Sequence, residues 1–166
     1  MSEHPVNQKT PTNFAVLVTS DTRTDKEDET GRTAVSLIEA EGHRVISHSI
    51  VPNDVERIRA EVERMLHNDF VRVIITSGGT GIGTKDRTVA AVSPLFDKEM
   101  PGFGELFRKL SYDEVGGAAI MSQATAGIAN KRLVFCLPGS RNAVKLALSK
   151  IILPNVGHMQ WEINRK

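Results

Sequence analysis

Nearly uninterrupted apolar runs alternate along this chain with segments of helical periodicity. The runs at 14–18, 71–75 and 133–137 carry hardly any polar residue, and 45–51 is rich in β-branched residues. A strand without polar alternation is buried on both faces, as the central strands of a parallel sheet are. Helical patterns separate these runs, which gives the order β-α-β-α-β-(helices)-β-α. This order predicts an α/β fold: a three-layer, doubly wound, mostly parallel sheet with helices on both faces.

The predicted helices have recognisable ends. Gly42 is expected to end the first helix. The second is expected to begin at Asn53, because Glu56 three residues later would complete a capping box. The last, over 143–151, is expected to stop at Pro154, since proline lacks the N–H that a helix interior needs.

The chain is expected to form one domain behind a short arm. Residues 1–12 contain two prolines and few apolar groups, so we expect a disordered arm there. No linker rich in Gly, Ser or Pro divides the rest, and 13–166 is therefore predicted to be a single domain. Within it, 88–130 is mostly helical by pattern, with breaks at Pro101-Gly102 and Gly116-Gly117.

Composition excludes several classes of function. The 166 residues include 21 Lys+Arg and 20 Asp+Glu, a formal net charge of +1, so no global field would attract nucleic acid or a membrane. The polar start is unlike a signal peptide, and no stretch approaches the roughly 20 apolar residues that cross a bilayer. The single cysteine, Cys136, has apolar flanks and is expected to be a buried, inert thiol. These features predict a cytoplasmic protein without a nucleic-acid or membrane partner.

Three of the four predicted strands end in polar or glycine-rich loops, at 20–22, 77–81 and 138–140. In doubly wound folds, ligands bind beyond the carboxyl ends of the strands. Because parallel strands have their carboxyl ends at one edge of the sheet, these loops are expected to converge there. We therefore expect the functional site at that edge.

The loop after the third strand is the most informative of the three. It has four glycines in six residues and then two cations and a carboxylate: Gly78, Gly79, Gly81, Gly83, Lys85, Asp86 and Arg87. The spacing fits neither a Walker A loop nor the dinucleotide fingerprint. The glycines could serve only a tight strand-to-helix turn, or they could let backbone N–H groups approach an anion. In the second case the charged residues suit a phosphate with Mg²⁺.

Two acids have a structural alternative to a role in this site. Asp86 could be the N-cap of the following helix, although Thr88 could fill that position and leave Asp86 for a ligand. Asp54 lies at the start of a predicted helix, where the macrodipole favours an acid without any site being involved. Spacing alone leaves both alternatives open.

Hydroxyl-bearing segments are similarly open to two interpretations. Ser20-Asp21-Thr22 could be an ordinary Asx or Ser/Thr turn, or a set of ligands. Pro138-Gly139-Ser140 could be a simple connection with Ser140 as an N-cap, or a second anion site at a helix N-terminus. No histidine accompanies these hydroxyls, so a Ser-His-Asp triad is not supported. The histidines have no metal-ligand spacing and are expected at the surface or half-buried: His4, His43, His48, His67 and His158.

Four motifs together carry a resemblance to a known family. They are Ser20-Asp21-Thr22-Arg23-Thr24, the Gly78-Gly79-Thr80-Gly81 loop with Asp86, Gly102-Phe103-Gly104-Glu105-Leu106-Phe107-Arg108, and Leu137-Pro138-Gly139-Ser140. In this order and spacing the chain resembles the MogA/MoaB/gephyrin G-domain family of molybdenum cofactor biosynthesis, from about residue 14 to the end. The stretch at 104–112 favours the MoaB branch over the MogA branch.

The resemblance implies a molybdopterin-binding fold and a reaction. Molybdopterin adenylyltransferases of the family use Mg-ATP to transfer AMP to the terminal phosphate of molybdopterin, releasing pyrophosphate. Asp86 is implied as the catalytic carboxylate and as a ligand of Mg²⁺, with Asp54 as a second acid. The residues expected to bind substrate or nucleotide are Ser20, Asp21, Thr22, Gly78, Gly79, Thr80, Gly81, Lys85, Ser122, Pro138, Gly139 and Ser140. The implied partners are molybdopterin, ATP, further copies of this chain in a homotrimer or homohexamer, and other molybdenum cofactor enzymes.

Two residues depart from the family's pattern. Asn53 stands where its adenylyltransferases tend to have an acid, which leaves Asp54 as a substitute, and Gln123 stands where the family usually has Arg. An amide replaces a guanidinium poorly as a phosphate ligand. The leading hypothesis is an adenylyltransferase. The alternatives are a non-catalytic molybdopterin-binding or carrier protein, and an oligomer that scaffolds other enzymes of the pathway.

Overall fold

A computed structural model describes residues 10–166, and its centre is one six-stranded sheet. In spatial order the strands are β2 (Arg44–Val51), β1 (Asn13–Thr19), β3 (Val73–Ser77), β6 (Arg132–Leu137), β5 (Thr125–Ala129) and β4 (Lys98–Glu99). The first four are parallel, whereas β5 is antiparallel to β6 and β4 is antiparallel to β5. The predicted mostly parallel sheet is confirmed.

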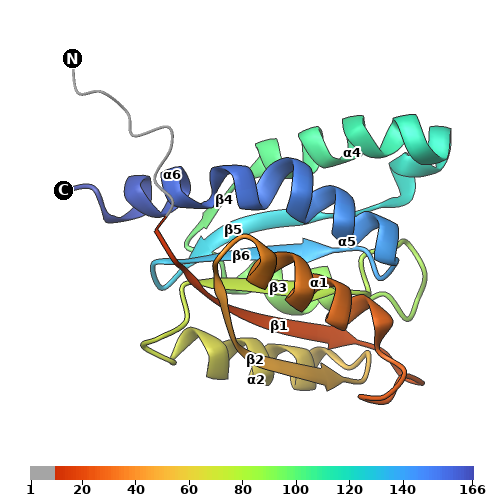
Figure 1. The fold of residues 1–166 in the computed structure, drawn as a ribbon. Coiled ribbons are helices and arrows are strands. Elements are labelled where there is room, and N and C mark those ends of the chain that lie inside the picture. The colour runs from red at the N-terminus through yellow and green to blue at the C-terminus, as the bar shows by residue number, and fades with distance from the viewer. Residues whose placement is uncertain (1–9) are drawn as a thin grey trace.

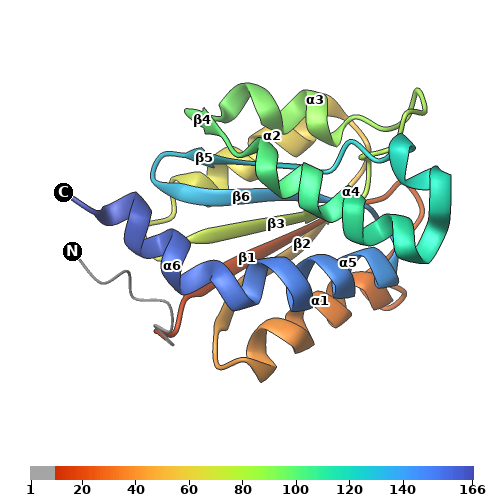
Figure 2. The ribbon, with the colours of Figure 1, turned by 90° about the horizontal axis from the view of Figure 1, so that it is seen from above.

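Helices cover both faces of the sheet. They are α1 (Glu29–Ala40), α2 (Val55–Leu66), α3 (Thr88–Val92), α4 (Pro101–Val115), α5 (Arg141–Ala147) and α6 (Leu153–Asn164). Short 3₁₀ turns, η1 (Ser93–Leu95) and η2 (Gly116–Met121), follow α3 and α4, and a π-helical turn, η3 (Leu148–Ile152), joins α5 to α6. Figure 2 shows α1, α5 and α6 on one side of the sheet and α2 and α3 on the other. These are the three predicted layers.

Alternation of side chains along the strands builds the two cores between these layers. In β1, Phe14, Val16 and Val18 belong to the core beneath α1, α4, α5 and α6. Ala15 and Leu17 belong to the core beneath α2 and α3. All five side chains are fully buried. Because a layer of helices packs on each face, both sets of alternate residues must be apolar.

The strand order reverses between β1 and β3. The chain passes from β1 to β2 on one side, and then through α2 back across β1 to β3 on the other side. In sheets of this kind, ligands bind beyond the carboxyl ends of the strands at the reversal. The arrowheads of β1 and β2 point away from the C-terminal end of the chain (Figure 1). The loops after the parallel strands therefore share the edge remote from that end.

The disordered arm was predicted at residues 1–12, and only residues 10–12 of it belong to the part of the chain that the structure describes. Residues 1–9 lie outside that part. Thr12 is buried, and its backbone N–H donates to Nδ1 of His43 at 3.1 Å. Thr12 is thus part of the folded chain.

Two strands interrupt the segment at 88–130 that was predicted to be mostly helical. β5 forms a hairpin with β6, and the turn residues Asn130 and Lys131 have positive φ angles of 46° and 59°. The sequence of β5 is rich in alanine and glycine, which carry little strand propensity. Small residues are needed here, since a Cβ on Gly127 would lie 2.5 Å from Cδ2 of Phe96. Tertiary packing therefore overrides the local pattern.

The predicted start of α2 is wrong by one residue. Oδ1 of Asp54 accepts a hydrogen bond from the Arg57 N–H at 2.9 Å, so Asp54 is the N-cap. Asn53 turns toward the preceding loop, where its Nδ2 lies 3.4 Å from Oδ2 of Asp21. A carboxylate also interacts more favourably with the helix macrodipole than a neutral amide does, which explains the order of the two residues.

The last helix does not stop at Pro154. The π turn η3 shifts the hydrogen-bond register immediately before the proline, and Pro154 lies in the first turn of α6. Proline is tolerated in a first turn because its missing N–H would have no helical partner there. The helix continues to Asn164 and buries Val156 against the sheet.

Two predictions from composition concern burial. Cys136 is fully buried, and burial raises the pKa of its thiol to about 12, as expected for an inert cysteine. Over residues 10–166, none of the helices combines the length and apolar character needed to cross a bilayer.

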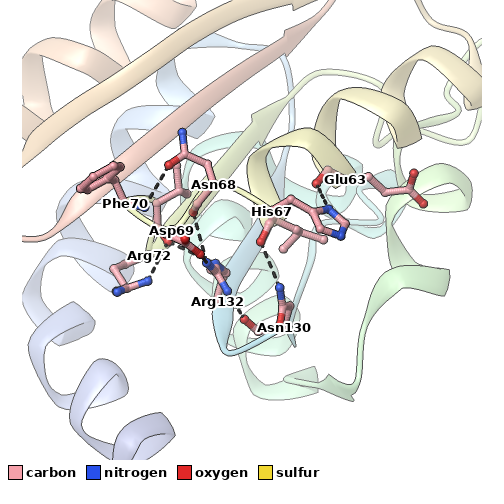
Figure 3. A network of polar contacts seen from close by, with 10 residues as sticks. Glu63, His67, Asn68, Asp69, Phe70, Arg72, Asn130 and Arg132 are labelled. Atoms are coloured by element: carbon pink, nitrogen blue, oxygen red, sulfur yellow. Dashed lines mark hydrogen bonds and ion pairs between the residues drawn. The ribbon is translucent and has the colours of Figure 1, made fainter.

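A polar network holds together the amino-terminal ends of β3 and β6 (Figure 3). Arg132, only 8% exposed, donates to the carbonyl groups of Val71 at 3.2 Å, Asn130 at 2.6 Å and Asn68 at 3.1 Å. Nδ2 of Asn130 donates to the Leu66 carbonyl at 3.1 Å. A buried cation requires such donors and acceptors to be satisfied. The network ties the β5–β6 hairpin turn to the end of α2 and the start of β3.

We expect Arg132→Met to lower the free energy of unfolding by about 3 kcal/mol, because three backbone carbonyl groups lose a donor that is itself buried. Urea denaturation would measure this change. The matched control is Arg64→Met, which removes an exposed arginine paired with Glu61 at 2.6 Å. Such surface pairs contribute below about 1 kcal/mol. An equal loss in both variants would contradict a structural role for the network.

Candidate functional site

The loops after β1, β3 and β6 are bonded to one another at the carboxyl edge of the sheet. The Gly78 N–H donates to the Leu137 carbonyl at 2.9 Å, and Oγ of Ser77 donates to the Pro138 carbonyl at 3.1 Å. Oγ1 of Thr19 donates to the Ser77 carbonyl at 3.4 Å. The predicted convergence of the three loops is confirmed.

Glycines permit this close approach. Gly78 has a φ of +102°, and a Cβ there would lie 2.5 Å from the carbonyl oxygen of Thr19. A Cβ on Gly139 would lie 3.3 Å from the Gly78 Cα. The glycines are thus required for shape. Since the Gly78 N–H is already bonded, a phosphate would have to be bound by N–H groups further along the loop, such as those of Gly79, Thr80 and Gly81.

The segment Ser20-Asp21-Thr22 forms a Ser/Thr turn that presents a carboxylate. Oγ of Ser20 accepts hydrogen bonds from the N–H groups of Thr22 at 3.3 Å and Arg23 at 3.0 Å. Asp21 is exposed, and its Oδ1 accepts from the Asn53 N–H at 2.9 Å. The turn is therefore ordered by its own hydroxyl and is tied to the loop after β2 through Asp21.

The charge of Asp21 is stabilised by its surroundings. Hydrogen bonds from the backbone N–H and the side-chain amide of Asn53 lower the pKa of Asp21, and nearby Lys85 and Arg87 lower it further. A lowered folded-state pKa means that this stabilisation is present above the usual value of 3.8 and is lost as the pH falls through the lowered one. At neutral pH the edge thus holds an ionised carboxylate beside two cations.

Asp86 closes the glycine-rich loop and does not cap a helix. Its Oδ2 accepts from the Gly83 N–H at 2.9 Å, and the N-cap of α3 is Arg87, without a side-chain cap bond. Thr88 lies inside α3, where its buried Oγ1 is 3.2 Å from Oγ1 of Thr19, so it is not the cap either. The capping alternative for Asp86 is wrong. The carboxylate is exposed above the loop, next to Lys85.

Two other candidate residues do cap helices. Asp54 caps α2, and Oγ of Ser140 accepts from the Ala143 N–H at 3.1 Å as the N-cap of α5. The structural alternatives for both are confirmed. Capping uses one oxygen of Asp54 and an acceptor position of Ser140, while the roles of both in binding stay predictions.

Ser122 and Gln123 lie against the glycine-rich loop, in a non-helical part of the segment at 88–130 that was predicted to be mostly helical. They follow η2 and precede β5, and the Gln123 N–H donates to the Thr80 carbonyl at 2.7 Å. Nη1 of Arg108 on α4 donates to the carbonyl groups of Ser122 at 3.3 Å and Ala124 at 3.0 Å. Arg108 thus fixes this segment beside the loop.

A cavity of about 680 Å³ opens beside these loops, between the end of α4 and the start of α5. Three of the predicted site residues line it, namely Ser122, Pro138 and Ser140, together with Phe107, Ser111 and Asn142. Its volume is in the range of small-molecule pockets, and its lining mixes apolar surface with hydroxyl and amide groups and the carboxylate of Glu114. The arrangement is suited to a polar organic ligand whose phosphate reaches the loops.

The sequence predictions missed a group of residues at the start of α1. The buried hydroxyl of Thr30 donates to the Gly139 carbonyl at 3.2 Å and accepts from Nη1 of Arg23 at 3.2 Å. Asp28, the buried N-cap of α1, accepts from the Gly31 N–H at 2.8 Å. An Asp directly before a helical pattern, with the acid Glu29 in the first turn, is a helix-start signal that could have been found. Nothing in the spacing points to Thr30 as a link between two loops.

Comparison with known sequences gives a family. The profile of the family described as "Probable molybdopterin binding domain" matches residues 15–158. The chain is similar to molybdenum cofactor biosynthesis protein B of Bacillus cereus, with 41% identity over 167 residues, 100% of this chain and 99% of that protein.

Solved structures give the same result. A crystal structure of molybdenum cofactor biosynthesis protein B has a TM-score of 0.92 and 42% identity, covering 96% of this chain and 100% of that one. The tungsten cofactor synthesizing protein MoaB from Pyrococcus furiosus has a TM-score of 0.86 and 35% identity, covering 93% and 98%. The resemblance carried by the sequence motifs is confirmed.

Two glycine substitutions should distinguish a glycine that the backbone shape of the loop requires from one that only leaves room for the Asp86 carboxylate. Gly78→Ala is expected to lower the free energy of unfolding by about 3 kcal/mol, because it combines an unfavourable φ with overlap of a backbone carbonyl. At Gly81 an added Cβ would lie 2.6 Å from Oδ2 of Asp86, an exposed side chain that can rotate away. Gly81→Ala is therefore expected to cost below about 1 kcal/mol while displacing the carboxylate. Thermal unfolding of both variants would test this, and similar losses would contradict it.

Proposed function

This chain belongs to the molybdopterin-binding domain family and is a molybdenum cofactor biosynthesis protein, and from that premise we propose that it adenylylates molybdopterin with Mg-ATP in the cytoplasm. The observation that carries the proposal is that the glycine-rich loop, Asp86 and two cations, Lys85 and Arg87, lie together at the edge where the strand order reverses. The adjacent cavity offers space for a pterin whose phosphate points to that edge.

The proposed reaction needs positioning more than a strong nucleophile. A terminal phosphate oxygen of molybdopterin attacks the α-phosphorus of ATP, the bond from that phosphorus to the bridging oxygen breaks, and pyrophosphate leaves with the electron pair. Charge accumulates on the transferred and leaving phosphates, so it must be neutralised by fixed donors. Lys85 and Arg87 supply positive charge beside the loop, and the N–H groups after Gly78 supply hydrogen-bond donors. This supports transfer without a catalytic histidine or cysteine.

The residues present fit a magnesium ion that arrives with the nucleotide. In the part of the chain that the structure describes, His, Cys, Asp and Glu side chains do not gather in threes as a preformed metal site. Magnesium is commonly held by one or two carboxylates plus substrate phosphates, and it would neutralise phosphate charge. The exposed Asp86 carboxylate suits that role. Asp21 suits it less, because both of its carboxylate oxygens accept from Asn53, whereas Asp86 accepts from the Gly83 N–H through Oδ2.

A non-catalytic molybdopterin-binding or carrier protein is the second candidate, and the amides at 53 and 123 favour it. Asn53 places a neutral group where a second carboxylate would help to hold a metal, and Gln123 lacks the guanidinium that would pair with a phosphate.

Incubation with molybdopterin and Mg-ATP, followed by assay of pyrophosphate, separates the candidates. Release of pyrophosphate dependent on molybdopterin supports the enzyme. Binding of molybdopterin without release supports the carrier.

We expect Asp86→Asn to reduce AMP transfer by about a hundredfold, as loss of one electrostatic stabiliser typically does. The change is nearly isosteric, and the amide oxygen can still accept from the Gly83 N–H, so thermal stability should be preserved. Asp69→Asn is the control, because Asp69 is 99% exposed and lies by the amino-terminal ends of the strands. Turnover of Asp86→Asn within about threefold of the wild type would reject its catalytic role.

Self-association is part of the proposal, as a homotrimer or homohexamer, and other molybdenum cofactor enzymes are proposed partners. Support comes from apolar side chains exposed on α4 and η2: Leu106, Tyr112, Val115, Ile120 and Met121. Exposed apolar groups gathered in this way mark contact surfaces. Size-exclusion chromatography with light scattering should therefore give several times the 18.2 kDa of one chain. A monomer at micromolar concentration would contradict this.

A further inference from the structure

A buried acid and a histidine lie next to the site without belonging to it. Asp28 is fully buried. Its Oδ1 accepts a hydrogen bond from the Gly31 N–H at 2.8 Å, and its Oδ2 lies 2.7 Å from Nε2 of His48. Nε2 of His48 can donate the hydrogen of this contact, and the carboxylate oxygen can accept it. The pair joins the first turn of α1 to β2, the edge strand of the sheet (Figure 1).

Gly31 is shaped to admit this pair. A Cβ at Gly31 would overlap both the Asp28 carboxylate and the His48 imidazole. Glycine in a helix is unfavourable relative to alanine by about 1 kcal/mol, so its presence in the first turn needs a reason. The close approach of the two side chains provides it. The contact is therefore built into the packing of α1 and is not an incidental surface pair.

The first turn of α1 is also where two of the site loops meet. Thr30, between Asp28 and the rest of the helix, bonds through its hydroxyl to the Gly139 carbonyl and to Arg23. Arg23 continues the Ser20-Asp21-Thr22 turn, and Gly139 packs on Gly78. A rotation of this turn would move both loops together.

We infer that His48 is a positioning residue: by holding Asp28 it fixes the first turn of α1, and through Thr30 it sets the spacing of the loops after β1 and β6. The ligand to which these loops are fitted is molybdopterin, and in that respect the inference rests on the proposed function. His48 touches no substrate in this arrangement. It acts on the site only through the Asp28 carboxylate and the Thr30 hydroxyl.

The test compares four single variants and one double variant, His48→Leu with Thr30→Val, with the wild type in molybdopterin affinity and in amide hydrogen exchange. His48→Leu removes the donor, whereas His48→Gln retains an amide N–H near the position of Nε2. Thr30→Val removes the hydroxyl link and leaves the Asp28 contact in place. His67→Leu is the control, because His67 is exposed, at the end of α2, and outside the site loops.

We expect His48→Leu to weaken molybdopterin binding about tenfold, a size typical of residues that couple to a site indirectly. His48→Gln should recover most of the affinity, and His67→Leu should match the wild type. Thr30→Val should weaken binding to a similar degree. The double variant should be little weaker than either single one, because both changes interrupt the same route. Unchanged affinity in His48→Leu, no recovery in His48→Gln, or multiplied losses in the double variant would overturn the inference.

Hydrogen exchange separates this inference from the proposed function. The Gly31 and Gly78 amides, bonded to Asp28 and Leu137, should exchange faster in His48→Leu than in the wild type. If the wild type binds no molybdopterin, the proposed function fails. The exchange rates alone then decide whether His48 fixes the loops. Faster exchange at both amides then supports the fixing of the loops by His48, and unchanged exchange overturns it.

Discussion

The bond from the Gly78 N–H to the Leu137 carbonyl continues the pairing of β3 with β6 beyond the end of β3, and the rest of the site is arranged around it. Gly78 can adopt its positive φ and lie against Thr19 only because it lacks a Cβ. Gly139 then packs on Gly78, and Thr30 reaches the Gly139 carbonyl. Three strands thus end in loops whose backbones are in contact before any functional side chain is considered. A ligand at this edge meets a surface whose shape is set by backbone packing.

The parts of the fold that depend on burial could be predicted from the sequence. Fully apolar runs at 14–18 and 133–137 identify central strands, because only a strand packed on both faces can dispense with polar alternation. The parts that depend on contacts between distant residues could not. The small residue Gly127 of β5 is required by the close approach of Phe96, and the alanine and glycine of this strand carry little strand signal of their own. Likewise, the tolerance of Pro154 depends on the π turn before it, which has no sequence signal of its own.

The candidate site shows the same division. Strand-end positions and residue types were sufficient to predict that the loops at 20–22, 77–81 and 138–140 converge. Spacing could not tell a capping acid from an exposed one. Asp54 and Asp86 have similar sequence surroundings at a loop-to-helix junction, yet Asp54 bonds to the N–H of its own helix and Asp86 bonds back into the glycine loop. The difference arises from the conformation of Arg87, which takes the N-cap position itself.

The amide of Asn53 shows how one atom affects the electrostatics of this edge. Its Nδ2 donates toward Asp21, while its buried Oδ1 has no hydrogen-bond partner within residues 10–166. An aspartate in this position would lose the donor and would bring a second carboxylate against Asp21. Two such carboxylates repel unless a proton or a cation lies between them. With Asn53, the negative charge of Asp21 is instead stabilised by hydrogen bonds from the backbone N–H and the side-chain amide. The backbone N–H of residue 53 holds the loops after β1 and β2 together with either side chain; the amide adds a second hydrogen bond to Asp21, whereas an acid would add a negative charge that a proton or a cation must offset.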